Sequence, residues 1–137
     1  MTPKALVEKA IEAMQKAYAP YSGYFVGAAL LTKDGKVYAG CNIENASYTP
    51  TICAERTAFS KAVSEGEREF TAIAIVGGKG GKMTGAFPPC GVCRQVMAEF
   101  CDPEAFKIYL GLPDGNFEEY TLRDLLPQGF FPSALQD

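Results

Sequence analysis

Two short motifs contain residues that could together bind a metal ion and use it. The first is C-A-E at residues 53–55 and the second is P-C-G-V-C at residues 89–93, in a chain without histidine. Thiolates from Cys53, Cys90 and Cys93 could hold a zinc ion and leave one of its four positions open for water. An open position is the mark of a catalytic zinc site, so we predict a catalytic centre here.

Two charged residues beside Cys53 extend this chemistry. Glu55 lies two positions after the first thiolate and cannot complete a thiolate set, so we predict that it is the base and acid acting on the metal-bound water. Three thiolates on Zn²⁺ leave a formal charge of about −1, which makes the metal a weak Lewis acid. We therefore predict that the Arg56 guanidinium donates hydrogen bonds to a thiolate and withdraws charge from it, the alternative being a solvent-exposed helix arginine.

The cysteines allow two other interpretations. A redox dithiol would use the C-x-x-C motif but would leave Cys53 and Glu55 without a role. A structural zinc would need a fourth protein ligand, which Cys41 or Cys101 could supply. We interpret Cys41, in a strand pattern, and Cys101, at a helix end, as small buried hydrophobic residues instead.

Composition and charge limit the classes of partner. The 137 residues are 47% hydrophobic, which predicts one domain, residues 1–137, with a hydrophobic core. No apolar run approaches the roughly 20 residues of a membrane helix, so we expect no membrane partner. The net charge of −3, with scattered lysines and arginines, argues against a nucleic-acid partner. Five cysteines without a signal peptide indicate reduced thiols in the cytoplasm rather than disulfides.

The hydrophobic pattern predicts the elements that position these residues. Helices are expected at residues 6–18, before Pro20; at 53–64; at 91–101; and after Thr121, ending before Pro127. Strands are expected at residues 25–32, 36–43, 71–76, 106–110 and 117–120, with turns at residues 34–35 and 114–115. The glycine-rich residues 77–82 are interpreted as a flexible connection. This order predicts an α/β layered domain around one mixed sheet.

The predicted helix starts also favour a shared metal site. Cys90 and Cys93 are three apart at the start of one helix, so their sulfurs can lie on one face. Cys53 stands at the start of another. The partial positive charge of both helix N-termini would then favour thiolates over thiols.

With these motifs in place, the chain resembles the small, homotetrameric cytidine deaminases. The similar segments run through nearly the whole chain, up to L-L-P at residues 125–127, and are A-P-Y-S (19–22), V-G-A-A-L (26–30), G-C-N-I-E-N-A-S-Y (40–48), C-A-E-R-T-A (53–58) and P-C-G-V-C-R-Q (89–95). The resemblance implies a three-layer α/β/α fold with one central, mixed, five-stranded sheet. It implies one zinc ion per subunit and the hydrolytic deamination of cytidine and 2′-deoxycytidine to the uridine nucleosides and ammonia, in pyrimidine salvage.

The same resemblance implies which residues bind the nucleoside. Asn42 and Glu44 would hold the ribose through its 3′-hydroxyl, and positions two apart on a strand do face the same way. Tyr24 would pack near the pyrimidine, and backbone groups near Ala54 would bind its edge.

Two further aromatic residues are implied to act across subunit interfaces of the homotetramer. Tyr48 and Phe130 match the places where the family reaches into a neighbouring subunit's site, with Phe131 as the adjacent alternative to Phe130. The pocket would then be complete only in the assembly.

Two rival functions remain open on the sequence. A deaminase for another aminated heterocycle would share the metal site, although Asn42 and Glu44 favour a ribose; a polynucleotide editor would need a basic stripe. A non-catalytic zinc or thiol module would bind a partner, and a fourth sulfur on the zinc would identify it.

Overall fold

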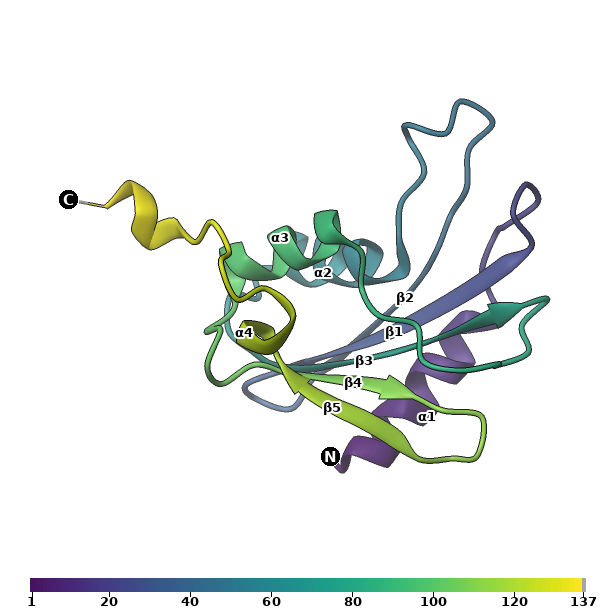
Figure 1. Ribbon diagram of the computed structural model, residues 1–137, viewed down its shortest axis with the longest axis horizontal. Helices are drawn as coiled ribbons and strands as arrows, with labels where there is room; N and C mark the ends of the chain where they lie inside the picture. The colour runs from purple at the N-terminus through teal and green to yellow at the C-terminus, as the bar shows by residue number, and fades with distance from the viewer. Residues whose placement is uncertain (137) are drawn as a thin grey trace.

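A five-stranded sheet forms the centre of the computed structural model, which describes residues 1–136 (Figure 1). The strands are β1 (Tyr24–Thr32), β2 (Val37–Cys41), β3 (Phe70–Lys79), β4 (Lys107–Gly111) and β5 (Phe117–Thr121). Their order is β2-β1-β3-β4-β5, with β3 and β4 parallel and the other three neighbouring pairs antiparallel. The expected mixed five-stranded sheet is confirmed.

Helices cover both faces of this sheet. They are α1 (Pro3–Met14), α2 (Ala54–Ser64), α3 (Gly91–Phe100) and α4 (Leu122–Leu125), followed by a 3₁₀ helix, η1 (Pro132–Leu135). In Figure 1, α1 lies on one face, and α2 and α3 lie on the other. Successive residues of β1 point to opposite faces, so Ala29 packs in the core under α1 while Ala28 and Leu30 pack with Phe59 of α2. The expected three-layer α/β/α arrangement is confirmed.

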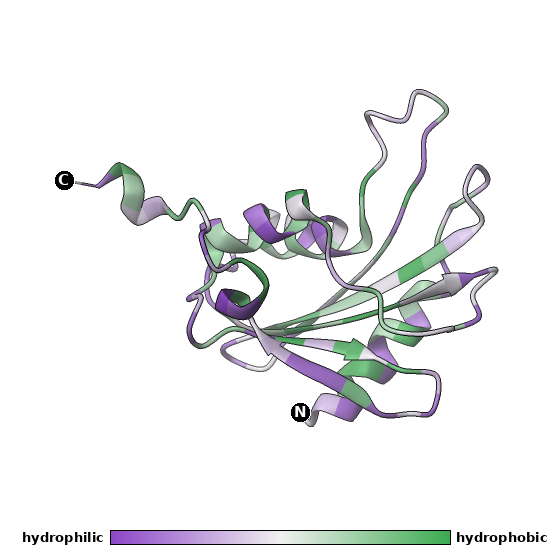
Figure 2. Cartoon of the chain, viewed as in Figure 1, coloured by the Kyte–Doolittle hydropathy of each residue, from purple (hydrophilic) through white to green (hydrophobic). Residues whose placement is uncertain are grey.

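Hydropathy explains which strands lie inside. Figure 2 shows hydrophobic residues concentrated in the central strands and hydrophilic residues in β5, at one edge. Charged side chains such as Glu118 and Glu119 suit an edge strand, because they discourage pairing with another chain.

Helix α1 ends four residues before the predicted end at Tyr18. Thr2 caps its start by accepting a hydrogen bond from the Ala5 backbone, at 3.1 Å, but the helix stops at Met14. Tyr18 instead pairs with the chain after β2: its backbone N–H donates to the Asn42 carbonyl, and its carbonyl accepts from the Glu44 N–H. These pairings lie far apart in sequence, so the helical spacing could not reveal them.

Strand β3 is longer than predicted, and the prediction of a flexible connection was wrong for residues 77–79. Residues 77–79 continue the strand and pair with Val26, Phe25 and Tyr24 of β1. Gly78 is required there, because a Cβ atom at this position would lie 1.7 Å from the Lys82 carbonyl oxygen. The glycines therefore permit a close approach within the sheet, and the extra pairing holds Tyr24 in β1.

The remaining elements agree with prediction to within a few residues. Strand β2 ends at Cys41 rather than Ile43, and β4 begins one residue after Phe106. Thr121 caps α4 in a reciprocal capping box with Asp124, and the helix ends before Pro127 as expected. None of the helices within residues 1–136 has both the length and the apolar character needed to cross a membrane.

Candidate functional site

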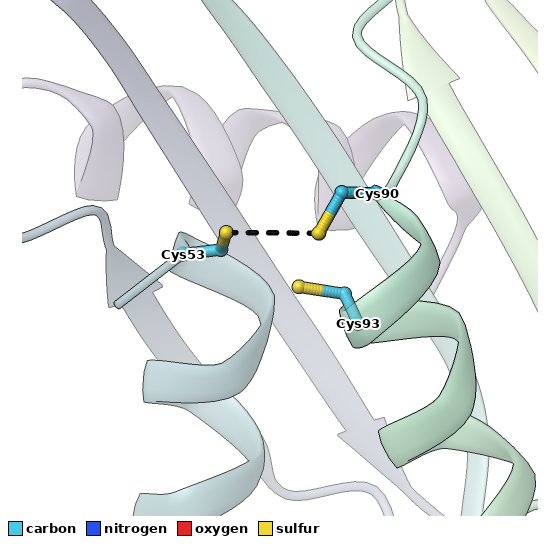
Figure 3. A group of neighbouring side chains, drawn as sticks. All are labelled: Cys53, Cys90 and Cys93. Carbon is cyan, nitrogen blue, oxygen red and sulfur yellow. Dashed lines mark hydrogen bonds between the residues drawn. The ribbon is translucent and has the colours of Figure 1, made fainter. Parts of the chain in front are cut away.

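The N-termini of α2 and α3 bring the three predicted ligands together. Cys53 is the N-cap of α2, Cys90 is the N-cap of α3, and Cys93 lies in the first turn of α3. Figure 3 shows the three sulfurs pointing toward one another across the gap between the helices. All three lie within 4.8 Å of one another, and Cys53 Sγ is 3.9 Å from Cys90 Sγ.

This geometry fits a zinc ion. Zn–S bonds of 2.3 Å in a tetrahedron place two sulfurs about 3.8 Å apart, close to the observed separation of Cys53 and Cys90. Neither cysteine sulfur makes a capping hydrogen bond to its own helix, so both sulfurs are free to face the centre of the group. The three residues therefore suit a trithiolate zinc site.

The pKa values of the Cys53 and Cys93 thiols are shifted in opposite directions. A hydrogen bond from Cys93, helped by the Arg56 guanidinium, lowers the pKa of the Cys53 thiol to about 5 against the opposing effect of burial. The same bond, together with burial, raises the pKa of the Cys93 thiol above its ordinary value. A bound metal replaces such thiol protons, so this cluster is prepared for a cation.

Glu55 is buried beside these sulfurs. Its side chain is only 4% exposed, although glutamate is rarely buried without a partner. Burial raises the pKa of Glu55 to about 7, while the neighbouring Cys93 thiol acts in the opposite direction as a hydrogen-bond donor. A carboxyl group with this pKa can both accept and donate a proton near neutral pH.

Arg56 contacts the first ligand directly. Its Nη2 donates a hydrogen bond to Cys53 Sγ at 3.6 Å, which is the contact expected of a residue that withdraws charge from the thiolate. Its Nε is buried without a hydrogen-bond partner among the described residues. The alternative of a solvent-exposed helix arginine does not describe this position.

A cleft of about 250 Å³ opens beside the sulfurs and Glu55. Its wall combines Cys53, Cys90 and Glu55 with the predicted substrate residues Asn42, Glu44 and Ala54 and with Val26, Thr51, Ile52, Ile75, Phe87 and Pro88. The sequence reasoning did not single out Phe87 and Pro88. The available signal was their place directly before the second cysteine motif, because residues adjoining a ligand must line its surroundings.

Asn42 and Glu44 reach the cleft while bracing the backbone around it. Asn42 Oδ1 accepts from the Val26 N–H and Nδ2 donates to the Tyr24 carbonyl, both at 2.8 Å. Glu44 Oε1 accepts from the N–H groups of Tyr21 and Ser22, each at 3.0 Å, and Oε2 accepts from the Ser22 hydroxyl. These bonds lower the pKa of Glu44, and each side chain retains hydrogen-bonding capacity for a ligand.

The three predicted aromatic residues occupy different places. The Tyr24 ring lies 6.1 Å from that of Phe87, which lines the cleft. Tyr48 is 71% exposed in an outer hollow of about 340 Å³, which shares Glu44 and Thr51 with the cleft. Phe130 is 58% exposed in the segment after α4 and does not line the cleft of its own chain.

The other two cysteines do not join the metal site. Among the described residues, the group of neighbouring ligand atoms consists of Cys53, Cys90 and Cys93 alone. Cys41 donates to the Lys16 carbonyl, and Cys101 is buried in the core, where burial raises the pKa of its thiol above the ordinary value. A fourth protein sulfur, the requirement of a structural zinc, is therefore not supplied by either residue.

Sequence comparisons identify relatives of this chain. Residues 1–109 match the family model described as "Cytidine and deoxycytidylate deaminase zinc-binding region". A protein from Halalkalibacterium halodurans, named cytidine deaminase, is 51% identical over 137 residues, the full length of both chains. A protein from Dictyostelium discoideum, named probable cytidine deaminase, is 43% identical over 125 residues, covering 88% of this chain and 81% of the relative.

Solved structures agree with these matches. The crystal structure of cytidine deaminase from Burkholderia pseudomallei is 50% identical, with a TM-score of 0.87 over 95% of this chain and 100% of that chain. That of cytidine deaminase from Mycobacterium tuberculosis is 39% identical, with a TM-score of 0.79 over 95% of this chain and 98% of that chain. The family model, the relatives and the shared fold therefore show that this chain belongs to the cytidine deaminase family.

Proposed function

We propose that this chain binds one zinc ion per subunit and hydrolyses cytidine and 2′-deoxycytidine to uridine and 2′-deoxyuridine with release of ammonia. The observation that carries the proposal is the buried carboxyl group of Glu55 beside three convergent cysteine sulfurs, at the wall of a cleft that also contains Asn42 and Glu44. Cys53, Cys90 and Cys93 would hold the zinc ion, which would supply an open coordination position for water and lower the pKa of that water.

Glu55 moves the protons of this reaction. With a pKa of about 7, it exists in both protonation states near neutral pH. As the carboxylate it takes a proton from the attacking water, and as the acid it delivers that proton to N3 of the pyrimidine, which makes C4 electrophilic. The resulting hydroxide adds to C4 to form a tetrahedral carbon. Glu55 then moves the proton of the new C4 hydroxyl to the amine, so that the C4–N bond breaks, the C4 carbonyl forms and ammonia leaves. Arg56 supports this chemistry by withdrawing charge from the Cys53 sulfur.

The rest of the cleft orients the nucleoside. Asn42 and Glu44 offer an amide and a carboxylate to the 3′-hydroxyl, a group that can donate and accept. Backbone groups near Ala54 bind the pyrimidine edge, and Phe87 lines the cleft with the Tyr24 ring 6.1 Å from its own. Because both sugars carry the 3′-hydroxyl, both nucleosides are accepted.

The assembly in this proposal is a homotetramer whose subunits complete one another's clefts. Tyr48 and Phe130 are exposed aromatic residues outside the cleft of their own chain, which supports a role at a neighbouring site. Phe131 is the weaker alternative, because it lies partly buried against its own core with the Arg123 guanidinium 4.9 Å from its ring. We place the enzyme in the cytoplasm, in pyrimidine salvage, without a nucleic-acid partner.

A substrate panel tests this proposal. Cytidine, 2′-deoxycytidine and free cytosine are incubated with zinc-loaded protein, and the loss of the cytidine absorbance band is compared with ammonia release. We expect stoichiometric turnover of both nucleosides and little of cytosine, which lacks the sugar held by Asn42 and Glu44. Zinc-loaded Glu55→Gln protein controls for contaminating enzymes. Turnover of another aminated heterocycle in place of cytidine would reassign the substrate, and an inert zinc protein would indicate a structural metal.

A further inference from the structure

We infer that Arg94 is a positioning residue that holds the Cys90 ligand by fixing the peptide group before it and tying that group to the end of α4. Arg94 Nε donates to the Pro89 carbonyl at 2.8 Å. The Arg94 backbone N–H also donates to the Cys90 carbonyl at 3.0 Å, but this is the ordinary helical bond that any residue other than proline would make here. The inference rests on the proposed function in taking Cys90 as a zinc ligand.

Cys90 needs such support more than the other ligand of the same helix. Cys93 is buried within the first turn of α3, whereas Cys90 is exposed and stands outside the helix as its N-cap. The N-cap residue has extended backbone dihedrals and lacks the full hydrogen bonding of the helix interior. The bond from Arg94 Nε to the Pro89 carbonyl therefore holds the backbone just before Cys90, although the Cys90 side chain is open to solvent.

The guanidinium is itself anchored on the other side. Arg94 Nη1 donates to the carbonyl of Leu125 at 2.7 Å. Leu125 is the last residue of α4, where a helix leaves carbonyls without partners in its own chain of hydrogen bonds. One planar side chain therefore joins the turn before α3 to the end of α4. Because the guanidinium is rigid, its hydrogen bonds to the Pro89 and Leu125 carbonyls fix the separation of these two segments.

The turn that Arg94 holds also forms the wall of the cleft. Phe87 and Pro88, directly before Pro89, line the cleft with Cys90. Pro89 is buried, so its carbonyl would lack access to water if the arginine were removed. Loss of the Arg94 side chain should therefore loosen the Cys90 thiolate and the neighbouring wall together.

A second arginine provides a matched control. Arg123 also holds the chain after α4, because Nη1 donates to the Pro127 carbonyl at 3.4 Å and the guanidinium lies over the Phe131 ring. It forms an ion pair with Glu104, and within residues 1–136 it makes no hydrogen bond or ion pair with the Pro89–Cys90 turn. Arg94→Met and Arg123→Met thus both remove an arginine from this region, but only the first frees the metal-binding turn.

The experiment measures zinc release from the zinc-loaded protein in excess chelator, followed with a chromogenic zinc indicator. We expect Arg94→Met to release zinc about 10- to 100-fold faster than wild type, the usual effect of losing a group that orients a metal ligand. Arg123→Met should release zinc at the wild-type rate. Equal rates for wild type and Arg94→Met, or equal acceleration in both variants, would overturn the inference.

Two additions keep the outcomes separate. Arg94→Lys retains the positive charge and one donor group, and it should give an intermediate release rate; it also replaces Arg94→Met if that variant does not fold. Ammonia release from cytidine by wild type is measured in parallel. Absence of ammonia would reject the proposed function, whereas the zinc-release comparison would still decide the role of Arg94.

Discussion

The N-termini of α2 and α3 meet at the same three sulfurs but differ in what they contribute. Each helix begins with a cysteine N-cap, Cys53 in α2 and Cys90 in α3. Two positions later, α2 carries Glu55, which is 4% exposed, and α3 carries Val92, which is 58% exposed. The carboxyl group to which we assign the proton transfers therefore belongs to α2, and α3 has no counterpart at this position.

The next two positions differ as well. Three residues after the N-cap, α2 has Arg56 on the Cys53 sulfur, while α3 has Cys93, a second ligand. Four residues after it, Thr57 donates from its hydroxyl to the Cys41 carbonyl at 3.0 Å, whereas Arg94 binds carbonyls before and beyond its helix. In the proposed function, α2 supplies one ligand together with the proton-transfer and charge-withdrawing groups, whereas α3 supplies two ligands, although each helix begins with a cysteine N-cap.

Removing one ligand from each helix should have the largest effect. Cys53→Ala and Cys90→Ala each leave two thiolates, too few for a stable site, so we expect loss of zinc and a fall in deaminase activity of several orders of magnitude. Elemental analysis of the purified variants measures the zinc. Cys101→Ala is the control, because Cys101 lies in the core outside the metal group and its variant should retain zinc. A full zinc complement in Cys90→Ala would remove that residue from the ligand set.

A second pair of variants, Glu55→Gln and Val92→Ala, tests the difference between the helices two residues after their N-cap cysteines. Glu55→Gln preserves shape but cannot shuttle protons, so kcat should fall by about 10²- to 10⁴-fold with zinc retained. Val92→Ala, at the equivalent position of α3, should leave kcat unchanged, because the Val92 side chain is exposed to solvent. Wild-type turnover in Glu55→Gln, determined by ammonia release, would refute the proton-shuttle role.

A smaller effect is expected from Arg56→Met. Without the guanidinium, the Cys53 thiolate keeps more charge and the zinc becomes a weaker Lewis acid, so kcat should fall about 10-fold. Zinc release should change less than in Arg94→Met, because Arg56 contacts the sulfur rather than the backbone of the ligand. Steady-state kinetics across pH measures this, and an unchanged kcat with an unchanged pH profile would contradict it.

The smallest predicted effect concerns Thr57, the counterpart of Arg94 in α2. Thr57→Val removes the hydroxyl bonds to the carbonyls of Cys41 and Cys53, at 3.0 and 3.2 Å, and should lower the free energy of unfolding by about 1 to 2 kcal/mol. Denaturant unfolding of the zinc-loaded protein measures it, with Ser60→Ala at an exposed position of α2 as the control. A loss equal to that of the control would show that Thr57 does not tie α2 to β2.

Local patterns predicted most of the scaffold because they report short-range physics. The strands, the capping box at Thr121 and the helix starts at Cys53 and Cys90 depend on neighbours a few residues away. The errors arose where distant segments compete with local preference. Tyr18 left the predicted helix to pair near Asn42, and residues 77–79 joined β3 because glycine allows a close backbone approach.

The sequence by itself determined the ligand types, the carboxyl group beside them and the helix starts that present both, because those follow from residue identity and spacing. Only the tertiary structure decided that Phe87 faces the cleft, that Asn42 also braces β1, and that Arg94 links the Cys90 turn to Leu125 across 31 residues of chain. Such contacts depend on how the layers pack, and no local periodicity encodes the distance between two loops that meet only after folding.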